Sequence, residues 1–588
     1  MPPPGVRLAR VLVCASVGLL AACGADEAAD LFPGDGLEAD VVDGVDAGED
    51  TATDAGDSDV GDVGGEDADP DGTEVLPDVV EVPETDPMPT RLRRLGAEQW
   101  DHIIHDVFGE DIVVPPLPEA EVNVGGLLSV GASEAGFSPR GVEALESIAF
   151  TIAEQVARSP EAWGPWFDCD GTLEAGCIEA GLPALGAQLW RRPLTTDEVD
   201  TIVGIAAAAR EALESEESAL EYALATLLQS PNFAWRSEMR AADDGDTFDG
   251  YSLAARLSFF LWDSVPDAEL LRAAAAGELD TTEGLVAQAE RMLDDPRARR
   301  GLATFVTQWL HLYELDALTK DPMLFEQYST LLGPDAREET LRVFESFVFD
   351  EPRDYRQIMT TRRTFLNPRL AALYGLPTPN PDGFAEVLLP ESTPRRGLLG
   401  HAGFLALHAH AVTSSVTLRG AAVREILLCQ TIPPPPVDVD TSIPEPSGDT
   451  PTLRDRVAEH LENPACAGCH NLTDPIGLGL ENYDGIGRYR DFDSSSGEPY
   501  PIDASGELDG AAFDGALELG AVIAEHRDFP RCLAQMLTRH ATGQVETFSD
   551  RDAIDALATN FAARGYLVRP VILDIVASPM FRLAGAPL

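Results

Sequence analysis

The sequence predicts a mainly α-helical protein, built from several serial helical modules with short β-hairpin or loop insertions. Apolar residues recur at helical spacing, so that Leu302, Phe305 and Trp309 fall on one face of a helix. The stretch 202–228 is rich in Ala and Glu, which favour helix. Few segments alternate apolar and polar residues with the period of two that a half-buried strand requires. These three observations predict a fold with little sheet.

Length and charge narrow the class of protein. With 588 residues the chain is expected to hold several domains, because single cores rarely grow beyond about 250–300 residues. Its formal net charge is −60, and Lys320 is its single lysine. A field this negative repels phosphate groups, which argues against nucleic acid or anionic lipid headgroups as partners.

The N-terminal segment 1–22 has the pattern of a secretory signal. Two arginines precede a short apolar run at 11–20, which is too short to span a bilayer as a stable helix. The following Leu-Ala-Ala-Cys resembles a bacterial lipobox, which predicts lipidation at Cys23. Gly24 is not an inner-membrane retention residue, so we expect attachment to the outer membrane, facing the periplasm or the cell surface. Ordinary cleavage, with Cys23 incidental, is the alternative.

Residues 23–90 are expected to form an acidic tether. No lysine or arginine occurs between Gly24 and Thr90, while Asp and Glu recur among Gly, Ala, Val and Pro. Such a segment buries too little apolar surface to fold, and its charges repel one another. Calcium binding is the alternative, but no complete twelve-residue calcium loop is present in the sequence.

The most specific chemical motif is Cys466-Ala467-Gly468-Cys469-His470. Covalent attachment of haem c requires two thiols, spaced to reach the two vinyl groups, and an adjacent imidazole to ligate the iron. The rival interpretations are a redox dithiol, half of a zinc site and a disulfide. The sequence contains no second C-x-x-C and no thioredoxin-like βαβ pattern. We therefore expect one covalent haem, with His470 as the proximal iron ligand.

The segment 470–488, which reads HNLTDPIGLGLENYDGIGR, extends this motif. It closely resembles the haem-site segment of a large planctomycete-type family of multi-domain exported proteins. Similar resemblances occur in order at 93–95, 106–109, 190–195, 255–262, 395–400, 413–416 and 501–507. Ser415 and Thr417 depart from the family, which carries Pro and Lys or Val there. Because the activity of the family is not established, the resemblance implies an architecture but no substrate.

The resemblance and the composition together imply a series of modules. A polyproline run at 433–436 and the Pro-, Asp- and Ser-rich stretch after it predict a linker before the last module. That module is expected to be a cytochrome c-like helical domain. The expected segments are helical modules at 91–165, 166–245 and 246–390, a fourth module with its linker at 391–446, and the haem-binding module at 447–588.

The distal iron ligand is less well defined by the sequence. Methionine is the usual distal ligand of electron-transfer cytochromes, and Met536 lies on a predicted helix at about 529–542. His540, one turn later on the same face, is an alternative. Further alternatives are His401, His408 and His410 of the preceding module. An iron closed by Met or His would indicate electron transfer, and an open iron would indicate catalysis or gas binding.

The remaining cysteines suit an oxidising compartment. Cys169 and Cys177 bracket a short loop and are expected to form a disulfide. Cys429 and Cys532 are then left to pair with each other, which would join the fourth module to the last. Two free buried thiols are the alternative for this second pair.

Other groups of polar residues give weaker signals. His102 and His105, with neighbouring Asp101 and Asp106, could form a metal cluster, but a partly exposed helix face is the simpler expectation. Asp263 and Asp267 are expected to cap helices. Arg256 and Arg419 are expected to form ion pairs with acids between modules. Common hydrolase and nucleotide motifs do not occur in the sequence.

Three classes of function are compatible with these features. The first is a lipid-anchored c-type cytochrome that exchanges electrons with a periplasmic or surface redox protein. The second is a haem enzyme or sensor with an open iron. The third is a non-catalytic surface scaffold without haem. The first class is the main expectation, although the long helical region before residue 447 is larger than an electron carrier requires.

Overall fold

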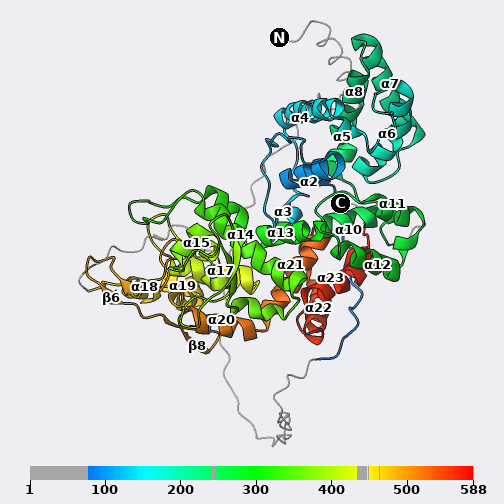
Figure 1. Ribbon diagram of the computed structural model, residues 1–588. Helices are drawn as coiled ribbons and strands as arrows, with labels where there is room; N and C mark the ends of the chain where they lie inside the picture. Colours follow the sequence, from blue (N-terminus) through cyan, green and yellow to red (C-terminus); the bar gives the residue numbers. More distant parts are fainter. Residues whose placement is uncertain (1–76, 242–245, 434–446, 448, 463, 587–588) are drawn as a thin grey trace, which may run out of the picture. The chain divides into compact units, whose positions relative to one another are not determined.

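Helices dominate the ranges that the computed structural model describes, which are 77–241, 246–433, 447, 449–462 and 464–586 (Figure 1). Within these ranges, the strands form two-stranded antiparallel pairs. The predicted mainly α fold class is therefore confirmed. The signal segment 1–22, Cys23 and most of the predicted tether 23–90 lie outside the described residues. Within the described ranges, no helix has both the length and the apolar character needed to cross a membrane.

Long helices alternate with short turns and a few short strands along the chain. The helices of the first half are α2 (Ala97–Phe108), α3 (Leu128–Gly131), α4 (Pro139–Arg158), α5 (Pro160–Trp163), α6 (Ala175–Trp190), α7 (Thr196–Leu213), α8 (Glu216–Leu228), α9 (Pro231–Ala234), α10 (Gly250–Leu261), α11 (Ala268–Ala275), α12 (Thr282–Leu293), α13 (Arg297–Trp309) and α14 (Leu332–Glu345). Those of the second half are α15 (Pro368–Leu373), α16 (Ala402–Leu407), α17 (Val416–Ala422), α18 (Leu453–Glu462), α19 (Pro464–Leu478), α20 (Gly515–Glu525), α21 (Asp528–Thr542), α22 (Arg551–Ala563), α23 (Val568–Ala577) and α24 (Pro579–Arg582). Short 3-10 or π turns are η1 (Glu278–Asp280), η2 (Leu312–Ala317), η3 (Ser346–Asp350), η4 (Tyr355–Met359), η5 (Leu398–Gly400), η6 (Val423–Leu427) and η7 (Phe548–Asp550). The strands are β1 (Arg93–Arg94), β2 (Trp235–Arg236), β3 (Arg363–Leu366), β4 (Ala385–Leu388), β5 (Phe492–Asp493), β6 (Tyr500–Pro501), β7 (Ser505–Leu508) and β8 (Ala511–Asp514).

The Ala- and Glu-rich stretch 202–228 forms two helices rather than one. Helix α7 starts at a capping box, in which the Thr195 hydroxyl accepts from the Glu198 amide and the Glu198 carboxylate accepts from the Thr195 amide. It stops where Glu214 adopts a left-handed conformation, with φ of 53°. Helix α8 follows and packs against α4, α6 and α7 (Figure 1).

The apolar face predicted around Leu302 lies on α13, and all of its residues are buried. Helix α13 packs on α10 and α14, and it also contacts α21 from the C-terminal part of the chain. Helix α12 contacts α23 in the same way. One hydrophobic core therefore includes residues from Met88 to Ala584.

Buried charges also connect distant parts of the chain. Strand β1 pairs with β2, which sets Arg93 opposite Arg236. The carboxylate of Glu238 accepts from both Arg93 and Arg256, and the Arg256–Glu238 distance is 2.9 Å. Arg256 also donates to the carbonyl of Phe581 at 3.1 Å. The expected ion pair of Arg256 is therefore present, and burial lowers the pKa of this guanidinium to about 9.

The loop-rich region after residue 490 contains two hairpins, β5–β6 and β7–β8. Strand β7 packs against α19, so this hairpin supports the helix that carries the C-x-x-C-H motif. A third pair, β3–β4, lies next to α14.

Candidate functional site

Helix α19 carries the cysteine–histidine motif and presents its three reactive side chains on one side. The helix begins at Pro464, a residue favoured in the first turn. At about 100° per residue, Cys466, Cys469 and His470 lie within an arc of about 100°. Both thiols are half-buried, and neither forms a disulfide. The Cys469 thiol donates to the carbonyl of Pro433 at 3.1 Å.

The histidine of the motif is held by a buried carboxylate. His470 Nδ1 lies 2.7 Å from Oδ2 of Asp474, one turn further along α19. Asp474 is completely buried, whereas the His470 side chain is 20% exposed. Because Nδ1 faces Asp474, Nε2 is the ring nitrogen suited to ligate a metal. Two free thiols and an oriented imidazole on one helix face fit the donor set of a covalent haem.

The other oxygen of Asp474 is also held. Its Oδ1 accepts from the Thr417 hydroxyl at 2.8 Å and from the Thr473 hydroxyl at 3.1 Å. Thr417 lies on α17, so the carboxylate joins two helices. This contact gives a structural role to one of the two departures from the family pattern.

Two glycines allow α17 and α19 to cross closely (Figure 1). A Cβ atom on Gly420 would lie 1.9 Å from the carbonyl oxygen of Thr473. A Cβ atom on Gly477 would lie 1.8 Å from the carbonyl oxygen of Val416. Neither contact is possible for a larger residue, so the crossing depends on glycine at both positions. The close approach places Thr417 within reach of Asp474.

Arg419 fixes the chain that follows α19. Its guanidinium is fully buried and donates to the carbonyls of Leu480, Tyr483, Asp484 and Leu405, at distances of 2.6–3.1 Å. The expectation that Arg419 forms an ion pair with an acid is therefore wrong, because its guanidinium is bound by carbonyl groups. Burial lowers its pKa to about 10.

A buried acid completes this scaffold. Glu481 accepts from the Ser414 hydroxyl at 2.9 Å and pairs with Arg490. Burial raises the pKa of Glu481, while the charges of Arg490 and Arg419 oppose that effect. The Asp484 carboxylate accepts from the amides of Ile486 and Arg488. Much of the family-like segment 470–488 therefore holds the backbone around α19.

The structure does not bring Met536 together with the motif. Met536 lies on α21, as predicted, but this helix packs on α3, α10, α13 and α22. The side chain is only 4% exposed, and a Cβ atom on Gly126 would lie 2.9 Å from its methyl group. Met580, the other downstream methionine, is buried in the same core.

The alternative histidines occupy different surroundings. His401 is buried with its Nδ1 3.1 Å from the Thr340 hydroxyl, and His540 is buried with its Nδ1 3.0 Å from the Ser129 hydroxyl. Burial lowers the pKa of His408 to about 3 and that of His540 to about 4. His410 is exposed on the loop after α16.

Both predicted disulfides are present. Cys169 is bonded to Cys177, and Cys429 is bonded to Cys532. The second bond joins the segment just after η6 to α21, which confirms the link that the sequence predicted between these two parts of the chain.

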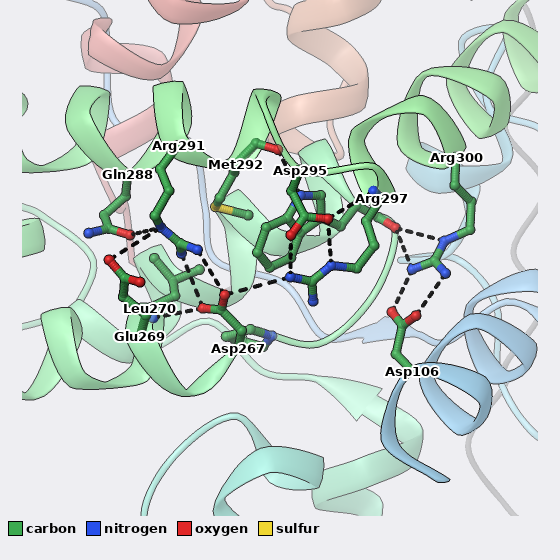
Figure 2. A network of polar contacts seen from close by, with 12 residues as sticks. Asp106, Asp267, Glu269, Leu270, Gln288, Arg291, Met292, Asp295, Arg297 and Arg300 are labelled. Carbon is green, nitrogen blue, oxygen red and sulfur yellow. Dashed lines mark hydrogen bonds and ion pairs between the residues drawn. The ribbon is translucent and has the colours of Figure 1, made fainter. Parts of the chain in front are cut away.

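A second group of charged residues surrounds the start of α13 (Figure 2). Asp267 accepts from Arg291 at 2.8 Å and lies 3.6 Å from Arg297. Arg300 forms a two-pronged ion pair with Asp106, at 2.5 and 2.9 Å. Asp267 also accepts from the Leu270 amide and caps α11, as predicted. Because each of these carboxylates is paired with an arginine, the network is structural.

The histidines of α2, which were considered as possible metal ligands, make hydrogen bonds within the protein. His102 Nδ1 lies 3.0 Å from Asp263, and His105 Nε2 lies 3.0 Å from the carbonyl of Ile112. Among the residues that the structure describes, no three His, Cys, Asp or Glu side chains are placed to hold a metal ion. Asp263 does not cap a helix, contrary to expectation, since it is buried with φ of 53° and accepts from Gln99 and Thr304.

Three contacts of the candidate site were missed by sequence reasoning. The spacing of His470 and Asp474 is i, i+4, which places the two side chains together on a helix and could have indicated their contact. No comparable signal linked Thr417 or Arg419 to α19, because both contacts depend on how α17 crosses that helix.

Four family models match consecutive parts of the chain. Each is described as a protein of unknown function: DUF1595 at residues 177–238, DUF1592 at 248–376, DUF1588 at 395–493 and DUF1585 at 509–581. The DUF1588 match contains α17, α19 and the C-x-x-C-H motif. No protein of curated function and no solved structure matches the chain. The four consecutive matches support the assignment of this chain to a multi-domain protein family of unknown function.

Proposed function

We propose that the protein is a c-type cytochrome of the bacterial cell envelope, anchored by lipid at Cys23, that exchanges electrons with a periplasmic or surface redox protein. Cys466 and Cys469 would hold one haem covalently, and His470 would be its proximal ligand. The bound haem would supply a one-electron iron couple.

The observation that carries the proposal is the arrangement on α19. The two thiols form no disulfide and share one side of the helix with His470, whose Nδ1 contacts the buried carboxylate of Asp474. This arrangement supplies two sulfur atoms for the thioether bonds and an imidazole whose orientation is fixed. The name of the model that matches residues 395–493, PSCyt3, agrees with an assignment of the cytochrome type.

The sequence also supports export. Attachment of haem to cysteine takes place outside the bacterial cytoplasm, and the signal segment with Cys23 would deliver the chain there. The two disulfides agree with an oxidising compartment. With a net charge of −60, the chain would associate fastest with a redox partner that presents a basic surface.

The test is a visible spectrum of the full chain, purified from a host that carries the haem-maturation machinery. We expect haem bands in the oxidised and dithionite-reduced protein that survive denaturation. They should be lost in Cys466→Ala/Cys469→Ala. The control is Cys169→Ala/Cys177→Ala, which removes a disulfide-bonded pair of cysteines far from α19 in the sequence and should keep the bands. A wild-type chain without haem bands contradicts the proposal.

A haem enzyme or sensor with an open iron is the second candidate, and the position of Met536 favours it. The elements that pack most extensively on α19 are α17, α18 and β7, whereas Met536 and Met580 lie on α21 and α24. Carbon monoxide distinguishes the two functions. A shift in the spectrum of the reduced haem on addition of carbon monoxide indicates an open or weakly closed iron. No change indicates closure by a strong protein ligand and supports electron transfer.

A further inference from the structure

We propose that Asp474 is a positioning residue that gives His470 anionic character and thereby makes the haem a low-potential centre, suited to a low-potential redox partner. The inference rests on the proposed function, because it concerns the haem that Cys466 and Cys469 would hold.

The partner of His470 is a carboxylate. The ring nitrogen Nδ1 faces a carboxylate oxygen at 2.7 Å, a length typical of a charge-assisted hydrogen bond. A carboxylate draws the Nδ1 proton more strongly than a neutral carbonyl does. The opposite nitrogen, Nε2, therefore becomes a stronger electron donor to a metal. A more basic ligand stabilises ferric over ferrous iron and lowers the reduction potential.

The carboxylate of Asp474 cannot turn away from His470. Asp474 is completely buried, and its Oδ1 accepts from the hydroxyls of Thr417 and Thr473. An ionised carboxylate only accepts hydrogen bonds, and His470, Thr417 and Thr473 each supply it with a donor. The crossing of α17 over α19 keeps Thr417 in place, so the orientation of Asp474 is built into the packing of the domain.

The charge of the chain acts in the same direction. The chain carries a net charge of −60, which also favours the ferric form. The partner that exchanges electrons with such a centre must itself be a one-electron carrier of low potential.

The main variant is Asp474→Asn, which removes the charge and keeps the shape. The amide oxygen can still accept from His470. The hydroxyls of Thr417 and Thr473 can rotate and accept from the amide nitrogen, because a hydroxyl both donates and accepts. The measurement is a spectroelectrochemical titration of the full, haem-loaded chain. We expect the ferrous form to be favoured at least tenfold more than in the wild type, which is a rise of at least about 59 mV for a one-electron couple.

A second variant, Thr417→Val, should shift the potential in the opposite direction. It removes one donor from Oδ1 and leaves the carboxylate in place, so more of the negative charge acts on His470. We therefore expect a potential below that of the wild type. General loosening of the site would shift both variants in the same direction. Glu498→Gln is the charge control, since it removes one exposed negative charge from the turn between β5 and β6.

The outcomes separate this inference from the proposed function. Opposite shifts in the two variants, with little change in Glu498→Gln, support the role of Asp474. If Asp474→Asn does not retain haem, the reduction potential of Thr417→Val tests the inference. A potential below that of the wild type supports the inference, and a potential above it overturns the inference. If neither variant changes the reduction potential by more than Glu498→Gln does, the inference is overturned, although the chain remains a cytochrome. A wild-type chain without haem overturns both.

Discussion

Replacing Arg419 with methionine should loosen the segment after α19 without unfolding the rest of the molecule. The substitution keeps an apolar stem of similar length but removes a buried guanidinium that donates to four carbonyl groups. Three of these carbonyls belong to residues 480–484, directly after the helix that carries the C-x-x-C-H motif. The effect should therefore be local to the candidate site.

The size of the effect follows from two opposing contributions. Hydrogen bonds from a charged donor contribute about 1.5–3 kcal/mol each, so four of them stabilise the native state by roughly 6–8 kcal/mol at the lower end of that range. Burial lowers the pKa of Arg419 to about 10, against an ordinary value of 12.5. At 1.36 kcal/mol per pH unit, the net cost of keeping this guanidinium charged in its buried site, which the variant avoids, is about 3 kcal/mol. The net loss of stability is about 3–5 kcal/mol.

Hydrogen exchange measured by mass spectrometry on peptides that cover residues 480–490 tests this estimate. Since 1.4 kcal/mol is a factor of ten in an equilibrium, exchange should be roughly 100- to 4000-fold faster in Arg419→Met. The control is Arg488→Met, whose side chain is exposed in the same segment. If both variants exchange at rates within tenfold of the wild type, the carbonyl contacts of Arg419 do not hold this segment and the reasoning is refuted.

Three further predictions concern stability and pH. Loss of the Cys429–Cys532 disulfide, which has a sequence separation of 103, should lower the free energy of unfolding by about 4.7 kcal/mol. Loss of the Cys169–Cys177 disulfide, with a separation of 8, should lower it by about 2.5 kcal/mol. Equal urea midpoints for the two double alanine variants would contradict this difference. Burial lowers the pKa of His540 to about 4 from an ordinary 6.5. The contribution of the neutral His540 to the free energy of unfolding is therefore intact above pH 6.5 and is lost as the pH falls toward 4, where the loss approaches about 3 kcal/mol. His540→Leu should show a smaller loss of stability over this pH interval, and an unchanged slope argues against the buried neutral form. Glu238→Gln leaves Arg93 and Arg256 buried without their shared countercharge and should cost about 3–5 kcal/mol, compared with almost nothing for the exposed Glu217→Gln.

Local patterns in the sequence predicted much of the fold. Helical spacing identified the buried face of α13, and cysteine arithmetic identified both disulfides. These features depend on short stretches of chain or on very few possible pairings. The stretch 202–228 is helical, as expected, but the left-handed conformation of Glu214 divides it into two helices and no Gly or Pro marks the break.

Contacts between distant segments were not predictable from the sequence. The pairing of β1 with β2 and the packing of α21 on α10 depend on the path of the whole chain. The same limit applies to the site: the motif at Cys466 was visible in the sequence, but Thr417 reaches Asp474 only because α17 crosses α19. For Met536, the helix was correct and its surroundings were not predictable, because the sequence does not show which partners α21 packs against.

Intact-mass and peptide mass spectrometry of the exported full-length chain would decide whether the protein carries haem. The peptide that contains Cys466 and Cys469 should carry the added mass of one haem, bonded through both sulfur atoms. Cys169, Cys177, Cys429 and Cys532 should remain as two disulfides. The contrary result is a peptide with two unmodified thiols or a Cys466–Cys469 disulfide, obtained from cells in which a known c-type cytochrome is fully loaded. That result would exclude a covalent haem and leave the surface scaffold as the remaining function.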